Sequence, residues 1–195
     1  MTRTGNIEKK DYSVSMLQAN IYALIMTAPF LLLFVVAYGL YWGWATMLEQ
    51  WEKLLDGNGS FLIIYLLFLL VLFVGTVFHE LIHAVTWVLV GRKNWSSIKF
   101  GFQASTLTPY CHIKEPMLVN PYRWGAVMPG IITGFLPALI GLLTGSLAVF
   151  LIGLFFVFAA GGDLLILWLI RKVEKSALVE DHPTRAGCYV LISQD

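Results

Sequence analysis

Long apolar runs separated by short polar segments dominate this chain of 195 residues. The runs cover residues 19–41, 61–90, 125–143 and 147–170. About 20 apolar residues are enough to cross a bilayer as a helix, so each run is long enough to span a membrane. We therefore predict an all-α membrane protein with four transmembrane helices in residues 19–170, and polar tails at residues 1–18 and 171–195.

The segment between the second and third runs has a different pattern. Residues 97–103 alternate between polar and apolar side chains, which is typical of a β-strand. Residues 107–113 can return as a second strand, and Pro109 restricts that strand to an edge or a bulge. We expect a short β-hairpin here, and a polar loop at residues 49–60 between the first and second runs.

Composition supports a membrane protein and gives few other clues. The chain is 58% hydrophobic and only 13% charged, which is too few charges for a soluble domain of this size. The formal net charge of +1 gives no sign of nucleic acid as a partner. Cys111 and Cys188 lack metal-site spacing and give no reason to propose a disulfide.

The distribution of lysine and arginine predicts an orientation. Of the 13 lysine and arginine residues, all but Lys53 lie in the two tails or between the second and third runs. With four spans, all of these segments fall on one side of the membrane. Positively charged loops stay in the cytoplasm, so we expect a multi-pass protein of the cell membrane with both termini cytoplasmic.

The candidate chemistry begins with His79-Glu80-Leu81-Ile82-His83 in the second run. On a helix, His79 and His83 project from the same face and can share one zinc ion. Glu80 can orient or deprotonate a metal-bound water molecule. Pentads of this kind also occur by chance in soluble proteins, but ionisable residues inside a membrane helix point to a function.

Asp163 is the acidic residue within the fourth run, which is interrupted at residues 159–163. His83 precedes Arg92 by nine residues and Asp163 precedes Arg171 by eight, so the two are expected at similar depth. Asp163 is therefore the candidate third ligand, in a His-His-carboxylate set that leaves one position open.

Other roles for these polar residues stay open. Asp163 could instead pair with a lysine or arginine, or take part in a proton relay. His112 is a rival ligand, although a polar loop residue or a group on the substrate side fits it better. His182 is expected to belong to a turn in the tail. One zinc ion is the expected cofactor, and iron or another divalent metal is the alternative.

Together these residues resemble the zincin peptidase family of bacterial membrane proteins, a domain family whose function is not established. The resemblance covers most of the chain after about residue 60 and rests on residues 79–84, 109–116, 122–129, 162–163 and 181–187. By wider analogy the chain looks like the site-2 protease group of intramembrane metallopeptidases. That resemblance implies a zinc ion held by His79, His83 and Asp163, with Glu80 as the catalytic base. The order Gly162-Asp163-Leu164 departs from the Leu-Asp-Gly usual in that group, and the chain has no room for a PDZ-like insertion.

The sequence thus predicts an intramembrane zinc metallopeptidase that hydrolyses a membrane protein or peptide. Zinc-bound water is the expected nucleophile and Glu80 the expected general base. The alternative is a metal-binding membrane scaffold, or a transport-related protein without proteolytic activity. A degenerate peptidase that binds helices without cutting them is a third reading, against which the intact Glu80 argues. The sequence assigns no role to Asp181.

Overall fold

Four long apolar helices form the body of the protein. The computed structural model describes residues 7–55, 61–103 and 108–193. Within these residues, four helical segments are long and apolar enough to cross a membrane: Met16–Trp42, Leu62–Leu89, Val119–Thr144 and Leu147–Leu169. The chain is therefore a multi-pass membrane protein, and the predicted fold class is confirmed.

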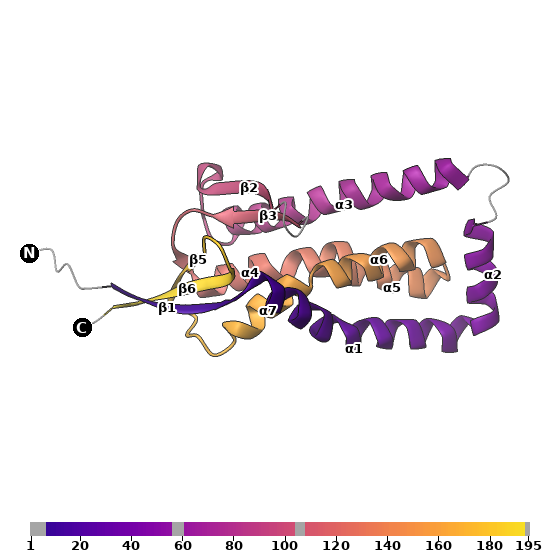
Figure 1. The fold of residues 1–195 in the computed structure, drawn as a ribbon, viewed down its shortest axis with the longest axis horizontal. Coiled ribbons are helices and arrows are strands. Elements are labelled where there is room, and N and C mark those ends of the chain that lie inside the picture. Colours follow the sequence, from indigo (N-terminus) through magenta and orange to yellow (C-terminus); the bar gives the residue numbers. More distant parts are fainter. Residues whose placement is uncertain (1–6, 56–60, 104–107, 194–195) are drawn as a thin grey trace, which may run out of the picture.

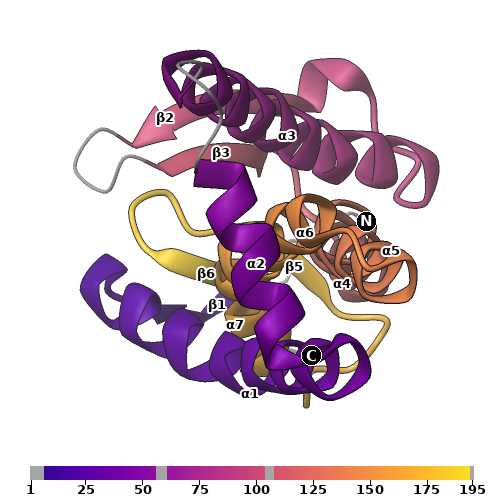
Figure 2. The same cartoon turned by 90° about the vertical axis from the view of Figure 1, so that its right-hand side faces the viewer.

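The spans run roughly side by side along the long axis of the molecule (Figure 1). Helices α1 (Met16–Trp42) and α3 (Phe61–Leu89) lie on opposite sides of the remaining helices in both Figure 1 and Figure 2. The third span consists of α4 (Val119–Pro129), the π-helical segment η2 (Gly130–Phe135) and α5 (Leu136–Thr144). The fourth consists of α6 (Leu147–Ala159) and α7 (Gly161–Leu169).

The third span begins earlier than the hydrophobic pattern indicates. Pro121 lies in the first turn of α4, where the missing N–H of proline has no intrahelical partner to lose. The helix can therefore begin at Val119 rather than at residue 125. Further along, a Cβ atom on Gly134 would lie only 2.7 Å from the backbone nitrogen of Val157. The small residues of this span thus allow α6 to pack directly against η2.

The prediction of a polar loop at residues 49–60 is wrong for its first half. Helix α2 (Trp44–Leu55) occupies these positions and runs across the end of the bundle (Figure 1). Its apolar side chains recur at helical spacing and its polar residues Glu49 and Lys53 fall on the other side. The segment is an amphipathic helix, which is typical of a membrane interface. The turn expected at residues 56–59 lies outside the described residues.

The polar tails form a sheet that the sequence analysis did not predict. Strand β1 (Ile7–Val14) pairs antiparallel with β6 (Ala186–Ser193) along its full length. The sheet continues through β5 (Leu178–Asp181) to the short β4 (Met117–Leu118), in the order β1-β6-β5-β4. Both tails therefore meet at the same end of the bundle (Figure 1).

The predicted hairpin is confirmed. Strands β2 (Ile98–Gln103) and β3 (Thr108–Ile113) pair antiparallel after the short 3₁₀ turn η1 (Trp95–Ser97), and residues 104–107 lie outside the described residues. A buried apolar cluster joins α3, the hairpin, α4 and the tail sheet; it includes Trp87, Ile113, Met117, Tyr122 and Cys188. This core fixes the sheet-bearing end of the molecule, next to the half of α3 that carries the pentad.

Candidate metal centre

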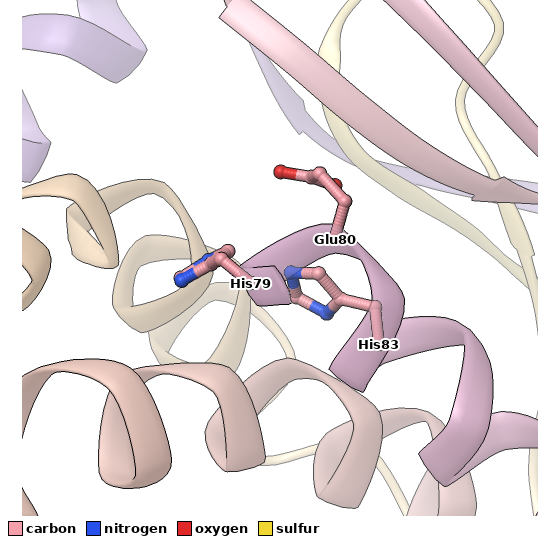
Figure 3. Close-up of side chains that lie close together, drawn as sticks. All are labelled: His79, Glu80 and His83. Atoms are coloured by element: carbon pink, nitrogen blue, oxygen red, sulfur yellow. The ribbon is translucent and has the colours of Figure 1, made fainter. Parts of the chain in front are cut away.

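The histidines of the pentad lie together on α3. One ligand atom from each of His79, Glu80 and His83 lies within 4.8 Å of the other two. Figure 3 shows the two imidazoles beside one another, with the Glu80 side chain leaving the helix in a different direction. Both imidazoles are buried, as expected for a face that packs against η2 and α4. His79 and His83 therefore lie together on one face of α3, as their spacing in the sequence predicted.

Thr133 determines which nitrogen of His79 carries the proton. The Thr133 hydroxyl lies 2.7 Å from the carbonyl oxygen of Pro129, which can only accept, so the hydroxyl donates there. The same hydroxyl lies 3.1 Å from His79 Nδ1 and accepts from it. The proton of neutral His79 is thus on Nδ1, and Nε2 presents a lone pair. Thr133 lies in the π-helical segment η2, a kind of distortion that is frequent at functional sites.

The backbone carbonyl of Gly125 orients His83 in the same way. His83 Nδ1 lies 2.9 Å from this oxygen and must donate to it, which leaves Nε2 as an acceptor. A Cβ atom on residue 125 would lie 1.8 Å from Trp87 Nε1, so only glycine allows α3 and α4 to approach this closely. The Trp87 ring packs between His83 and Tyr122, with centroid distances of 5.6 Å and 5.7 Å.

Asp163 meets both histidines from α7. Its Oδ2 atom lies 3.1 Å from His79 Nε2, and its Oδ1 atom lies 3.4 Å from His83 Nε2. Helix α7 begins at Gly161, where a Cβ atom would lie 2.8 Å from the Cβ of Ala23 on α1. The break in the fourth span thus places Asp163 in the first turn of a new helix. The structure brings together the three residues that the sequence analysis proposed as ligands.

The chemistry of this cluster fits a bound divalent cation. Both Nε2 atoms are lone-pair acceptors, and the carboxylate oxygens facing them accept as well. Two nitrogens and a carboxylate form the donor set of many catalytic zinc sites, and atoms bound at about 2.0–2.1 Å to a tetrahedral ion lie about 3.3 Å apart. Histidine ligands usually donate their other ring N–H to a carbonyl or another polar group, as both do here.

Glu80 faces the hairpin. Its carboxylate accepts a hydrogen bond from the backbone N–H of Cys111 on β3. The Cys111 thiol lies beside the backbone of Ala84, and its burial, together with the negative charge of Glu80, raises the pKa of this thiol. The predicted base is therefore held between the metal-binding face of α3 and one strand of the hairpin.

Asp181 is a polar site residue that the sequence analysis did not assign. This carboxylate on β5, whose side chain is 10% exposed, accepts from the Tyr122 hydroxyl at 2.5 Å and from the Ile113 N–H at 2.8 Å. His112 Nδ1 lies 3.2 Å from the same carboxylate. Burial raises the pKa of Asp181, and the Tyr122 donor opposes that shift. The rival ligand His112 thus faces Asp181.

His182 lies in a turn, as expected. Its Nδ1 atom accepts from the backbone N–H groups of Thr184 and Arg185.

The fold and the cluster together define a multi-pass membrane protein with two histidines and an aspartate converging beside a glutamate. Residues 72–178, more than half of the chain, match the family described as "Putative zincin peptidase". The chain belongs to this family, so the resemblance found in the sequence is confirmed. No curated protein and no solved structure matches the chain. The likeness to the site-2 protease group stays a prediction.

Proposed function

We propose that this protein is an intramembrane zinc metallopeptidase that hydrolyses peptide bonds of membrane-associated proteins or peptides. The observation that carries the proposal is the convergence of His79 Nε2, His83 Nε2 and the Asp163 carboxylate. Thr133 and the Gly125 carbonyl leave the two Nε2 atoms as acceptors, and the carboxylate is an acceptor as well. This set suits a cation and leaves a fourth position for a reactant. Membership in a zincin peptidase family supports the same chemistry.

Glu80 is the proposed general base. A zinc ion supplies a Lewis acid that polarises a carbonyl and makes water nucleophilic near neutral pH. Glu80 takes the proton of the attacking water and delivers it to the leaving amine. The backbone N–H of Cys111 contacts one side of this carboxylate. Because Glu80 is next to His79 in the chain, the base and the two histidine ligands are held on the same helix, α3.

The hairpin is the proposed binding surface for the substrate. A helical peptide bond is shielded by its own turn, so the substrate must be extended where it is cut. Within the described residues β3 pairs only with β2, which leaves its other edge, on the Glu80 side, without a partner strand. Glu80 and Asp181 hold the amides of this edge, and its outward carbonyl groups can accept main-chain hydrogen bonds from an extended peptide.

The proposed location is the cell membrane, with both termini in the cytoplasm. The excess of lysine and arginine in the tails and the hairpin segment supports this orientation. The pairing of β1 with β6 places both tails at one end of the bundle, as the orientation requires. Water and the substrate would then reach the site from the cytoplasmic side.

The test compares the purified protein with two single variants in proteoliposomes. Zinc is measured after dialysis, and synthetic single-span peptides are analysed by mass spectrometry for new amino termini. Glu80→Gln should keep its zinc and lose cleavage, whereas Glu115→Gln, an exposed glutamate beside Lys93, should keep both. Full cleavage by Glu80→Gln would overturn the mechanism. Zinc binding in a wild type that cuts none of the peptides would favour the scaffold alternative.

A further inference from the structure

The two edges of β3 carry different hydrogen-bonding groups. In an antiparallel pair, alternate residue pairs point their N–H and C=O groups away from the partner strand. Pro109, which has no N–H, stands opposite Phe102, and Cys111 and Ile113 follow it at alternate positions. The amides of Cys111 and Ile113 therefore belong to the outer edge. Their partners agree, because Cys111 donates to Glu80 and Ile113 donates to Asp181.

Asp181 holds this outer edge from a different element. Its Oδ2 atom accepts from the Ile113 N–H and faces His112 Nδ1, while its Oδ1 atom accepts from the Tyr122 hydroxyl. One carboxylate thus ties β5 to β3 and to the first turns of α4. Strand β3 has no neighbouring strand on this side among the described residues, so a side chain supplies the contact that a ladder would otherwise make.

We propose that Asp181 is a positioning residue for the reaction. It fixes the outer edge of β3 so that the Cys111 amide stays on Glu80 and the carbonyl groups of this edge are presented to an extended substrate. The part that concerns the substrate rests on the proposed peptidase function; the part that concerns the strand does not. Asp181 lies beyond the segment that matches the family, in the sheet made by the two tails. Through the side chain of Asp181, the tail sheet contacts the outer edge of β3 beside the site.

The chemistry of Asp181 favours this role over simple packing. Burying a carboxylate is unfavourable unless several donors surround it, and an apolar side chain in such a position avoids the desolvation free energy of the charge. Here two hydrogen-bond donors and the His112 imidazole, from two other elements, converge on it. Asp181→Asn removes the negative charge that strengthens these contacts. Its N–H₂ group must also face either Ile113, whose amide then loses its acceptor, or Tyr122, whose hydroxyl must then accept instead of donate. The expected effect is a loosened strand edge.

Thiol labelling tests the position of the strand without any metal or substrate. In a Cys188→Ser background, Cys111 is the single thiol, and it lies between Glu80 and Ala84. With metal-free protein well below its melting temperature, Asp181→Asn should label with maleimide roughly tenfold faster than its parent. Asp11→Asn, an exposed carboxylate on β1, should label at the parental rate. Equal rates for Asp181→Asn and the parent would overturn the proposal.

Tyr122→Phe is the second variant, for the case in which Asp181→Asn fails to fold. It keeps the ring stacked on Trp87 and removes the hydroxyl donor to Asp181. It should show a smaller acceleration of Cys111 labelling in the same direction. Labelling at the parental rate would count against Asp181 as the residue that holds the edge.

Kinetics with the synthetic single-span peptides separates positioning from folding. Asp181→Asn should keep its zinc and raise KM more than it lowers kcat, because the variant loses the edge that binds the substrate. A purely structural role would lower the folded or zinc-loaded fraction and leave KM unchanged, which would overturn the proposal. If the wild type cuts no peptide, the proposed function fails, and the labelling result still decides whether Asp181 positions the strand.

Discussion

The Nε2 atom of His79 lies 3.1 Å from Oδ2 of Asp163, although the two residues come from different membrane spans. The Thr133 hydroxyl accepts a hydrogen bond from Nδ1–H of neutral His79, so neither of the facing atoms is a donor. Two acceptors at this distance repel each other unless a proton or a cation lies between them. The same relationship holds between His83 and Asp163, which makes one shared cation the simplest solution.

Replacing Asp163 with alanine should greatly weaken zinc binding. The variant loses one of three proposed ligands, so its zinc affinity should fall by more than the roughly 10–100-fold that follows the loss of a supporting hydrogen bond. Affinity is measured by competition with a chromophoric chelator. Asp11→Asn is the control, since this carboxylate lies on β1. Unchanged zinc affinity in Asp163→Ala would remove Asp163 from the site.

Thr133→Val should reduce zinc affinity by about 10–100-fold, because it removes the acceptor that fixes His79 while it keeps the shape of the side chain. Thr133→Ser retains the hydroxyl and should bind zinc nearly as well as the wild type. The two variants are compared by the same chelator competition. If valine and serine behaved alike, the hydroxyl would have no part in orienting His79.

The residues of the candidate metal centre could be predicted from the sequence because they differ in character from the residues around them. His79, His83 and Asp163 are ionisable side chains within apolar runs, where such residues are conspicuous. The comparison of depths succeeded because α3 and α7 approach the same end of the bundle with regular helical rise. Thr133 and the Gly125 carbonyl could not be found in this way, since hydroxyls and backbone groups are ordinary in a membrane helix.

Asp181 was not assigned for the opposite reason. It lies in a polar tail, where an aspartate attracts no attention, and it becomes buried only because β5 packs beside the hairpin. Strand pairing over such long separations leaves little local trace in the sequence. Helix α2 was a different kind of miss, because its apolar side chains do recur at helical spacing. The charged residues at 49, 52 and 53 led to the prediction of a polar loop, although they lie within an amphipathic helical pattern.

Cys188 should react with iodoacetamide in an unusual pH-dependent way. Burial raises the pKa of this thiol to about 12. Because the thiolate is the reactive form, its rate in the folded protein should keep rising about tenfold per pH unit from about pH 7 to pH 9. An ordinary thiol, with a pKa near 8.5, approaches a plateau over this range. Rates are read by mass spectrometry in a Cys111→Ser background, with the unfolded protein as control. A plateau for folded Cys188 would contradict its burial.

Helix α2 should lie in the membrane interface with its apolar side in the acyl chains. Leu48 is 62% exposed, and Trp44 and Trp51 on the same side are about half exposed, which is unfavourable in water. Lys53 lies on the other side of the helix and can stay hydrated. An environment-sensitive NBD label should therefore emit at shorter wavelength from Leu48→Cys than from Lys53→Cys, with both native cysteines replaced by serine. A spin-labelled lipid should also quench the label at position 48 more strongly. Equal emission and equal quenching at the two positions would show that α2 does not lie flat on the bilayer.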